Sequence, residues 1–423
     1  MIVAPDKFKG SLTATEVARH ITAGLYAGVV SAGVPASSLQ VTAIPLADGG
    51  EGTVDAAVGA GWREVVRSVS GPTGDLVPAS FARRSPTLDP LAITYRASDD
   101  DTRHDDAGGA ALVEMAQASG LDRLSGGVPA PLTASTRGTG ELVRAALDDG
   151  ADEILLAVGG SASTDGGAGM LVALGARLLD GHGRDLPDGG GALRTLERVD
   201  LTQFDPRARA ARWTLAADVD NPLLGPRGAA AVFGPQKGAS AADVATLDAG
   251  LACFAQALAA ACHHDQRAGD GWDARRDATH ELAGAGAGGG IGLVALGLLG
   301  AVRRPGVEVV LELTGWAQRT GGASLVITGE GSLDAQSLGG KTPVGVAAAA
   351  ARLGAPVVVL SGRRLLTEET WRAAGFADAR ALSDLEPDTA RCIAEAGGLL
   401  ERLAHDLGRE IAIFVNCPDG VGR

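Results

Sequence analysis

The sequence contains few cysteines and no recognisable cysteine motif. Its 423 residues include four, with no C-x-x-C spacing between any two of them: Cys253, Cys262, Cys392 and Cys417. Free thiols in this arrangement indicate a reducing compartment such as the cytosol, and not a secreted protein held by disulfides. The run from Cys262 to Asp265 has metal-capable side chains, but adjacent side chains point in different directions. We therefore predict a solvated helix end there and not a metal site.

The sequence also shows no excess of positive charge, no leader-like segment and no long hydrophobic run. The formal net charge is −14, and no basic stripe is present, which argues against a nucleic-acid partner. A small anionic substrate stays possible, because local lysines would decide its binding. The longest apolar run, residues 291–302, has 12 residues and is too short to cross a bilayer. Met1 is followed directly by a strand-like segment, so we expect a cytoplasmic protein with no membrane partner.

Glycine is abundant, and the rest of the composition is that of a soluble globular protein. Glycine accounts for 62 residues, roughly twice the usual share of ~7%, so many turns bring the backbone close to something. Hydrophobic residues make up 45% of the chain and charged residues 21%, which excludes a disordered protein. The length predicts two domains of ordinary size and not one large core.

Short β-rich segments alternate with Ala/Leu-rich helical segments along almost the whole chain, which predicts an α/β fold with a parallel sheet. Thr13 and Glu16 form a predicted capping box for a helix that reaches about residue 30. A closing helix is expected from about residue 401, and the acidic run 99–106 is interpreted as a solvated loop. The expected strands are 2–4, 41–44, 153–158, 213–216, 325–327 and 356–360.

Loops rich in glycine and carboxylates follow five of these strands. In open α/β sheets ligands bind beyond the carboxyl ends of the strands. Glycines let backbone N–H groups approach phosphate oxygens, carboxylates hold Mg²⁺ beside phosphates, and lysine supplies a point charge. Each loop alone could be ordinary turn material, but five together supply the parts that phosphoryl transfer requires. The loops are 6–11, 48–52, 159–169, 218–222 and 329–341.

Two glycine motifs match known fingerprints only in part. Residues 340–342 fit the end of the P-loop pattern G-x-x-x-x-G-K-[ST], but Ala335 stands where the leading glycine should be. The run Gly284–Gly289 matches G-x-G-x-x-G, yet no convincing strand precedes it and no such fingerprint follows the first strand. We interpret it as a loop at a helix entry, which argues against a nicotinamide-dependent oxidoreductase.

Six sequence blocks resemble the bacterial type I glycerate kinase family. They occur in the family's order and cover nearly the whole chain, up to about residue 405. The blocks are "APDKFKGSLTATEVA" (4–18), "PLADGGEGT" (45–53), "ASTRGTGEL" (134–142), "VGGSASTDGGAGMLVALG" (158–175), "DVDNPLLGPRGAAAVFGPQKGA" (218–239) and "ITGEGSLDAQSLGGKTPVGVA" (327–347).

The resemblance implies an enzyme that phosphorylates D-glycerate with ATP and Mg²⁺, and it favours 2-phosphoglycerate over 3-phosphoglycerate as the product. It also implies two α/β domains with parallel or mixed sheets, the second inserted into the first, and an active site in the interdomain cleft. We expect the first, Rossmann-like domain to combine residues 1–75 with 283–423. The inserted α/β domain would then comprise residues 76–282.

The same resemblance assigns roles to residues of the loops. We expect the catalytic residues to be Lys9, Asp48, Glu51, Asp334 and Lys341, with Asp48 and Asp334 as Mg²⁺ ligands. The expected cofactor-binding residues are Ser11, Gly159, Gly160, Ser161, Asp165, Gly166 and Glu330. In this interpretation Lys9 and Lys341 neutralise the transferring phosphoryl group. Gly159–Gly169 approaches it across the cleft.

The sequence departs from the family pattern at Ser332, where the family often has an arginine in G-E-G-R-[IL]-D. A contact with the substrate carboxylate or a phosphate made by that arginine is lost or moved. Lys7 replaces a common serine, and the first strand is short enough to suggest a start codon further upstream. A kinase for a related small hydroxy acid and a non-catalytic glycerate or nucleotide sensor remain the alternatives. The general base, the division of loops between nucleotide and glycerate, and the oligomeric state, a homo-oligomer included, stay open.

Overall fold

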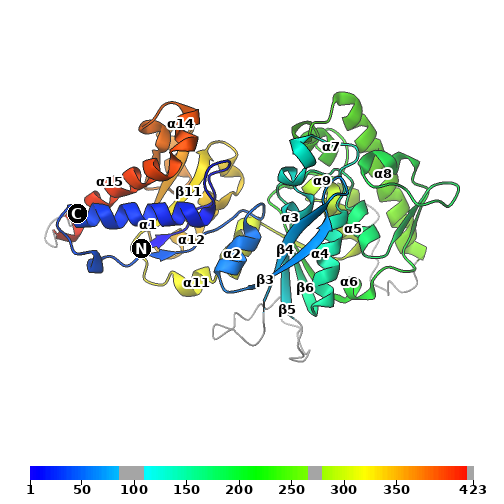
Figure 1. Cartoon of the computed structure of the whole chain (residues 1–423), viewed down its shortest axis with the longest axis horizontal. Coiled ribbons are helices and arrows are strands. Elements are labelled where there is room, and N and C mark those ends of the chain that lie inside the picture. Colours follow the sequence, from blue (N-terminus) through cyan, green and yellow to red (C-terminus); the bar gives the residue numbers. More distant parts are fainter. Residues whose placement is uncertain (85–108, 265–278, 417–423) are drawn as a thin grey trace. The chain divides into compact units, whose positions relative to one another are not determined.

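The structure, a computed structural model, describes residues 1–84, 109–264 and 279–416. The chain divides into two compact units, with residues 1–48 and 307–423 in unit 1 and residues 49–306 in unit 2 (Figure 1). The acidic run 99–106, Asp265 and Cys417 lie outside the described residues. The helix that precedes Asp265 is described as far as His264, and Cys262 on it is buried.

Unit 1 is built on a five-stranded sheet whose strands all run parallel, in the order β13-β12-β11-β1-β2. The strands are β1 (Ile2–Val3), β2 (Thr42–Ala43), β11 (Val326–Leu333), β12 (Val357–Arg364) and β13 (Asp378–Ala381). Helices connect successive strands, as parallel pairing requires. The helices are α1 (Ala14–Ser31), α10 (Gly306–Leu313), α11 (Trp316–Arg319), α12 (Thr342–Ala351), α13 (Glu368–Ala373), α14 (Thr389–Ala394) and α15 (Ala396–Asn416).

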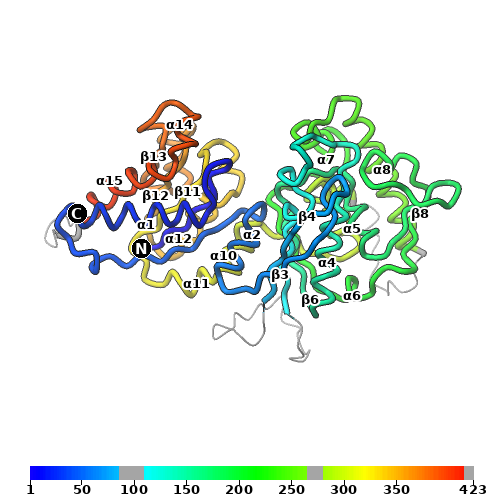
Figure 2. Tube along the Cα trace, viewed as in Figure 1, coloured from blue at the N-terminus to red at the C-terminus, as the bar shows by residue number. Residues whose placement is uncertain are grey.

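Helices α1 and α15 lie side by side against the sheet of unit 1 (Figure 2). The predicted capping box starts α1, because the Thr13 hydroxyl accepts from the Glu16 N–H at 3.2 Å and the Glu16 carboxylate accepts from the Thr13 N–H at 2.8 Å. The closing helix begins at Ala396, five residues before the expected start. The two helices bury apolar side chains against β1, β11 and β12, so the first and last helical segments of the chain complete one core.

Unit 2 contains a six-stranded mixed sheet in the order β10-β9-β6-β5-β4-β3 and a small hairpin, β7-β8. Its strands are β3 (Arg63–Ser70), β4 (Leu76–Arg83), β5 (Gly109–Glu114), β6 (Ala151–Ala157), β7 (Arg177–Leu179), β8 (Arg198–Asp200), β9 (Arg212–Ala216) and β10 (Val302–Arg304). Its helices are α2 (Thr53–Gly59), α3 (Met115–Ser119), α4 (Arg137–Asp148), α5 (Ala168–Ala173), α6 (Pro206–Ala210), α7 (Ala229–Phe233), α8 (Ala241–His264) and α9 (Ala287–Leu293). With the parallel sheet of unit 1, this confirms the predicted α/β fold with parallel and mixed sheets.

Helix α8 is long and apolar enough to cross a membrane by length and composition, and among the described residues it alone passes that test. The longest uninterrupted apolar run, residues 291–302, is a different segment, so a search for such runs did not detect α8. One side of α8 packs into the core of unit 2 through Leu247, Leu251 and Phe254. Asp243 and Asp248 interrupt its apolar character. The side of α8 that carries the three apolar residues therefore belongs to the core of unit 2.

The expected boundaries at residues 75/76 and 282/283 differ from those of the two compact units. Strand β4 pairs with β5 and strand β3 pairs with β4, so both belong to the sheet of unit 2. Strand β10 pairs with β9, and α9 packs into the core of unit 2, which moves the second boundary to residues 306/307. The alternation of helix and strand in the sequence does not show which sheet a strand joins, so the boundaries of the compact units could not be derived from it.

Strand β11 is also longer than predicted. It was expected to end at Ile327, but it pairs with β12 as far as Leu333. Glycine and charged residues lower strand propensity, yet Gly329 removes a clash here, since a Cβ on it would lie 2.5 Å from the Leu360 carbonyl oxygen. Glu330 and Ser332 therefore belong to a hydrogen-bonded strand and not to a loop.

The contact between α1 and α15 predicts a sharp difference between two glycines. A Cβ on Gly28 would lie 2.1 Å from the His405 carbonyl oxygen, whereas a Cβ on Gly398 of α15 would meet nothing within 4 Å. We expect Gly28→Ala to lower the free energy of unfolding by about 1–3 kcal/mol and Gly398→Ala to raise it by about 0.5–1 kcal/mol. Urea unfolding with hydrogen exchange of the α1 and α15 amides would measure both, and equal effects would contradict the packing.

Candidate active site

Asp6 follows β1 and is buried among the elements of unit 1. Its Oδ2 accepts a hydrogen bond of 2.6 Å from the Thr342 hydroxyl at the start of α12, and its Oδ1 accepts one of 2.7 Å from the Lys7 N–H. Burial raises the pKa of Asp6 to about 6, and the carboxylate of Asp48 adds to this, while the charge of Lys7 and the Thr342 hydroxyl act in the opposite direction. The end of β1, the end of β2 and the start of α12 therefore share one electrostatic environment.

A tight turn presents Lys9 next to β11. The Phe8 N–H donates to the Leu12 carbonyl at 2.8 Å, and Gly10 closes the turn with φ +76°. The turn lies close to β11, since a Cβ on Gly331 would come within 3.2 Å of the Lys9 nitrogen. Lys9 is exposed at the end of this turn. The first and last sequence loops predicted for the site are thus neighbours in unit 1.

Glu330 lies on β11 and is only 6% exposed. Its Oε1 atom is buried and has no hydrogen-bond donor among the described residues. Burial raises the pKa of Glu330 to about 7, opposed by the Ser337 hydroxyl and the charge of Lys341 and reinforced by the carboxylates of Asp6 and Asp334. A buried carboxylate oxygen with no donor and a pKa near neutrality is a strong candidate for a functional group.

Asp334 lies in the turn that follows β11, in a more polar environment. Its Oδ2 accepts from the Ser332 hydroxyl at 2.9 Å, and its Oδ1 accepts from the Gln336 N–H at 2.9 Å. Burial raises the pKa of Asp334, but these hydrogen bonds and the charge of Lys341 outweigh it and lower the pKa overall. Lys341 is the N-cap of α12 and interacts electrostatically with Asp334 and Glu330. The pKa of Glu330 is therefore raised, and that of Asp334, four residues later, is lowered.

These carboxylates fit a hard divalent cation. Mg²⁺ takes oxygen ligands and is usually bound by one or two carboxylates together with substrate phosphates. Asp6 is coupled to Asp48, and Glu330 to Asp6 and Asp334, so oxygen donors of the right chemistry are concentrated at this end of the sheet. Over the described ranges, no group of three or more His, Cys, Asp or Glu side chains is placed to hold one ion. The assignment of Asp48 and Asp334 as ligands stays a prediction.

Ser11, predicted to bind cofactor, points elsewhere. Its hydroxyl donates to the Ile393 carbonyl oxygen at 3.2 Å, which ties the end of the turn to α14. This hydrogen bond gives Ser11 a structural role in the turn that carries Lys9.

In unit 2, the loop after β6 packs directly on residues 49–51. The Gly159 N–H donates to the Gly49 carbonyl at 3.2 Å, and a Cβ on Gly159 would lie 2.5 Å from the Cα of Gly50. A Cβ on Gly160 would lie 2.9 Å from Oε1 of Glu51. Two predicted loops separated by more than a hundred residues of sequence are thus brought together, and only glycine permits their approach.

Glu114, at the end of β5, is a residue that the sequence interpretation missed. It is 1% exposed, and its two carboxylate oxygens accept from the N–H groups of Gly52 and Val54 at 3.3 and 2.9 Å. These amides open helix α2, so Glu114 caps the loop that carries Glu51. The signal in the sequence that could have identified Glu114 is its place as a single acidic residue directly after the apolar run 109–113.

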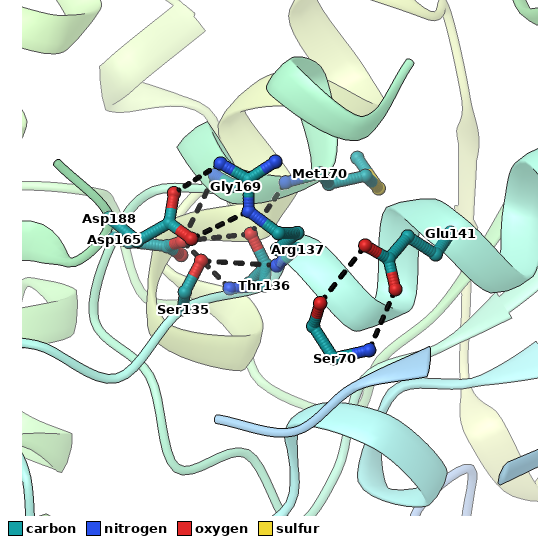
Figure 3. A network of polar contacts seen from close by, with 9 residues as sticks. All are labelled: Ser70, Ser135, Thr136, Arg137, Glu141, Asp165, Gly169, Met170 and Asp188. Carbon is teal, nitrogen blue, oxygen red and sulfur yellow. Dashed lines mark hydrogen bonds and ion pairs between the residues drawn. The ribbon is translucent and has the colours of Figure 1, made fainter. Parts of the chain in front are cut away.

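Asp165 is fully buried and holds the glycine loop together (Figure 3). Its Oδ2 accepts from the N–H and hydroxyl of Thr136, both at 2.8 Å, and from the Gly169 N–H at 3.1 Å. Its Oδ1 accepts from the Gly167 N–H at 3.2 Å. Burial raises the pKa of Asp165, opposed by Thr136 and the loop amides. Predicted to bind cofactor, Asp165 is turned toward the loop itself.

Lys237 reaches the same loop from the other side and is 2% exposed. Its ammonium donates to the Ser161 hydroxyl at 2.8 Å and to the Ser163 carbonyl at 2.5 Å. Burial lowers the pKa of Lys237 to about 7, and the charge of Asp165 opposes this shift. The Gly166 N–H donates to the Gly289 carbonyl at 3.0 Å. Ser161 and Gly166, both predicted cofactor contacts, therefore already have partners within unit 2.

Gly289 belongs to the partial G-x-G-x-x-G run. Among the described residues 279–283 that lead into the run no strand is present, and the glycines 288–290 all have positive φ at the entry to α9. The prediction of a helix-entry loop is confirmed. A Cβ on Gly289 would lie 2.0 Å from the Ser163 carbonyl oxygen, so this loop supports the one after β6.

The lysines of the chain are concentrated in these loops. The sequence contains only four, and all its other basic side chains apart from histidine are arginines. The four are Lys7, Lys9, Lys237 and Lys341. Every one of them lies in a loop described above.

A sequence model described as the glycerate kinase family matches residues 1–412. A protein named glycerate kinase from Halalkalibacterium halodurans is 42% identical over 364 residues, which are 86% of this chain and 85% of that protein. A protein named glycerate 2-kinase from Escherichia coli K12 is 39% identical over 86% of this chain and 84% of its own length.

A solved structure extends this similarity to the fold. The crystal structure described as that of a glycerate kinase 2 from Salmonella typhimurium LT2 matches with a TM-score of 0.73 and 36% identity, over 98% of both chains. Fold and relatives together define a kinase, an enzyme that transfers a phosphoryl group. The chain belongs to the glycerate kinase family.

The burial of Lys237 predicts a pH-dependent stability. Its pKa is about 7 in the folded protein against an ordinary 10.5, so between pH 7 and 10.5 the unfolded chain binds more protons and stability rises with pH. The destabilisation by Lys237 is therefore complete at pH 7 and below and disappears toward pH 10.5. We expect Lys237→Met to gain stability relative to wild type most at pH 7 and progressively less at higher pH. Urea unfolding from pH 6 to 10 would measure this, and a pH-independent difference would contradict it.

Proposed function

We propose that this protein phosphorylates D-glycerate with ATP in the presence of Mg²⁺. The observation that carries the proposal is the buried Glu330 Oε1, which lacks a donor among the described residues and belongs to a carboxyl group with a pKa of about 7. A substrate hydroxyl would supply the missing hydrogen. A carboxylate with this pKa is well matched to act as a general base near neutral pH.

In the proposed reaction a hydroxyl oxygen of glycerate attacks the γ-phosphorus of ATP. The bond between this phosphorus and the oxygen bridging to the β-phosphate breaks, and its electron pair leaves with ADP. The hydroxyl proton passes to Glu330 Oε1. Asp334, whose pKa is lowered, stays ionised throughout, so the two carboxylates of the β11 segment take different roles. Opposite environments for neighbouring carboxyl groups are a common basis for such a division.

Positive charge around this carboxylate pair would neutralise the phosphates. Lys341 stands at the N-terminus of the ten-residue helix α12, where backbone N–H groups and the helix dipole favour an anion. Lys9 lies beside β11 on its own turn. Mg²⁺, held by Asp48 and Asp334 together with the phosphates, would neutralise charge on the β- and γ-phosphate oxygens when bound.

Within unit 2, a Cβ on Gly160 would lie 2.9 Å from Oε1 of Glu51, and we propose that Glu51 and Gly160 take part in binding. Asp165, Lys237 and Glu114 would hold their loops in shape without touching the nucleotide.

The finer assignments are part of the same proposal. Phosphorylation at O2 is favoured, because the Escherichia coli relative is named glycerate 2-kinase, and the cytoplasm is the expected location. A kinase for a related small hydroxy acid is the second candidate, since the same base and the same cations would serve any short hydroxy acid.

The first test is a direct assay of purified protein with ATP, Mg²⁺ and D-glycerate. We expect glycerate-dependent release of ADP and a ³¹P NMR signal of 2-phosphoglycerate. A 3-phosphoglycerate signal would keep the kinase and reject attack by O2. ADP release that is equal with and without glycerate, from folded protein, would reject glycerate as the acceptor and direct the assay to other hydroxy acids.

Removing the proposed base should change both rate and pH profile. Because the base works ionised, kcat/KM of the wild type should rise with pH up to about 7 and then level off. Glu330→Gln should lower kcat by at least ~10² and abolish this rise. Glu369→Gln, an exposed residue in the first turn of α13, is the matched control and should behave as wild type. A Glu330→Gln enzyme with an unchanged pH profile would exclude Glu330 as the base.

A further inference from the structure

Arg363 is an exposed arginine at the carboxyl end of β12, beside the proposed reaction centre. Its register partner on β11 is Ser332, and its Nε donates to the Ser332 hydroxyl at 3.1 Å. That hydroxyl in turn donates to Asp334 Oδ2 at 2.9 Å. Arg363 is thus linked by two hydrogen bonds to a carboxylate that the proposed function places at the transferred phosphoryl group.

The neighbouring arginines differ from Arg363 in that each of them contacts an acidic side chain. Arg364 reaches Asp384 at 3.5 Å and the Ala379 carbonyl, and Arg380 reaches Glu410 and Asp378. In the part of the chain that the structure describes, the contact with Ser332 is the one polar contact of Arg363. Its terminal Nη1 and Nη2 groups therefore form an open fork, held in orientation through Nε.

We propose that Arg363 binds the carboxylate of the hydroxy-acid substrate, an inference that rests on the proposed function. An arginine fork matches the two oxygens of a carboxylate in a planar, bidentate arrangement. Lysines already stand at the proposed phosphate positions, and as point charges they suit phosphate. The arginine is therefore assigned to the planar acid end of the substrate.

The strand geometry sets the distance between Glu330 and Arg363 that the substrate would bridge. Glu330 is in register with Ser361 and Ser332 with Arg363, so Glu330 and Arg363 are two residues apart along the sheet and side chains at these positions share one face. Two residues along the strand, combined with the spacing between neighbouring strands, separate the two positions by roughly 8 Å. A three-carbon acid with its hydroxyl at Glu330 and its carboxylate at Arg363 bridges this span through two hydrogen bonds.

The pair Ser332 and Arg363 also accounts for the departure from the family pattern. Where the family often has an arginine on the β11 segment, this chain has serine, and it carries a guanidinium at the paired position of the next strand. The positive charge stays at the same edge of the sheet and has moved from one strand to its neighbour.

Steady-state kinetics with glycerate and with glyceramide, in which a neutral amide replaces the carboxylate, tests the assignment. We expect Arg363→Ser to lower kcat/KM for glycerate about 10- to 100-fold, the range for a lost charged hydrogen-bonding pair, and to change the KM for ATP less than about 3-fold. The preference of the wild type for glycerate over glyceramide should collapse by the same factor in this variant. A structural role alone would affect both substrates equally.

Two further variants complete the test. Arg352→Ser removes an exposed arginine at the C-terminal end of α12. This end lies about 15 Å from Lys341 along the ten-residue helix, so the variant should leave kcat/KM for both substrates unchanged. The double variant Ser332→Arg with Arg363→Ser returns the guanidinium to β11 and should recover glycerate turnover to within about 10-fold of wild type.

The possible outcomes separate this inference from the function on which it rests. An active wild type with an Arg363→Ser variant that keeps its preference for glycerate, or that loses ATP affinity instead, would overturn the carboxylate assignment alone. A wild type with no glycerate turnover would overturn the proposed function and this inference with it.

Discussion

Burying a carboxyl group costs free energy unless hydrogen bonds or positive charge compensate it, and this requirement shapes the candidate site. In unit 2, both carboxylate oxygens of Asp165 and of Glu114 accept hydrogen bonds from backbone N–H groups, and Asp165 also accepts from the Thr136 hydroxyl, so these acids fix loops. In unit 1, Glu330 keeps one buried oxygen without a donor among the described residues. The fully satisfied acids form the framework, and the incompletely satisfied acid is left for chemistry.

Glycine makes these burials possible, because it lets backbone amides come close enough to serve as donors. The approach of residues 49–51 to Gly159 leaves no room for a Cβ, and a Cβ on Gly331 would make a tight contact of 3.2 Å with the backbone nitrogen of Lys9. The loop after β6 and residues 49–51 are therefore closely packed on each other. The role of the glycine-containing loops is to place side chains such as Glu51 and Lys9 from neighbouring strand ends.

Local signals in the sequence predicted local structure well. The capping box of Thr13 and Glu16 and the apolar strands near the site were placed correctly, because short-range hydrogen bonds and side-chain periodicity determine them. Pairing between strands could not be predicted. The continuation of β11 past Ile327, the membership of β3 and β4 in unit 2 and the partnership of Ser332 with Arg363 depend on residues distant in sequence. The resemblance to a family identified the loops, but the structure showed which side chains of those loops serve the loop itself.

The scarcity of lysine gives the molecule an unusual chemical surface. Apart from the terminal amine, its only primary amines are Lys7, Lys9 and Lys341 around the carboxylates of unit 1 and the buried Lys237 of unit 2. Reagents that acylate amines, or supports that couple proteins through them, would therefore act at the terminal amine and at the candidate site. Guanidinium groups carry the remaining positive charge and do not react in this way at neutral pH. Labelling or immobilisation of this protein is best directed to residues other than lysine.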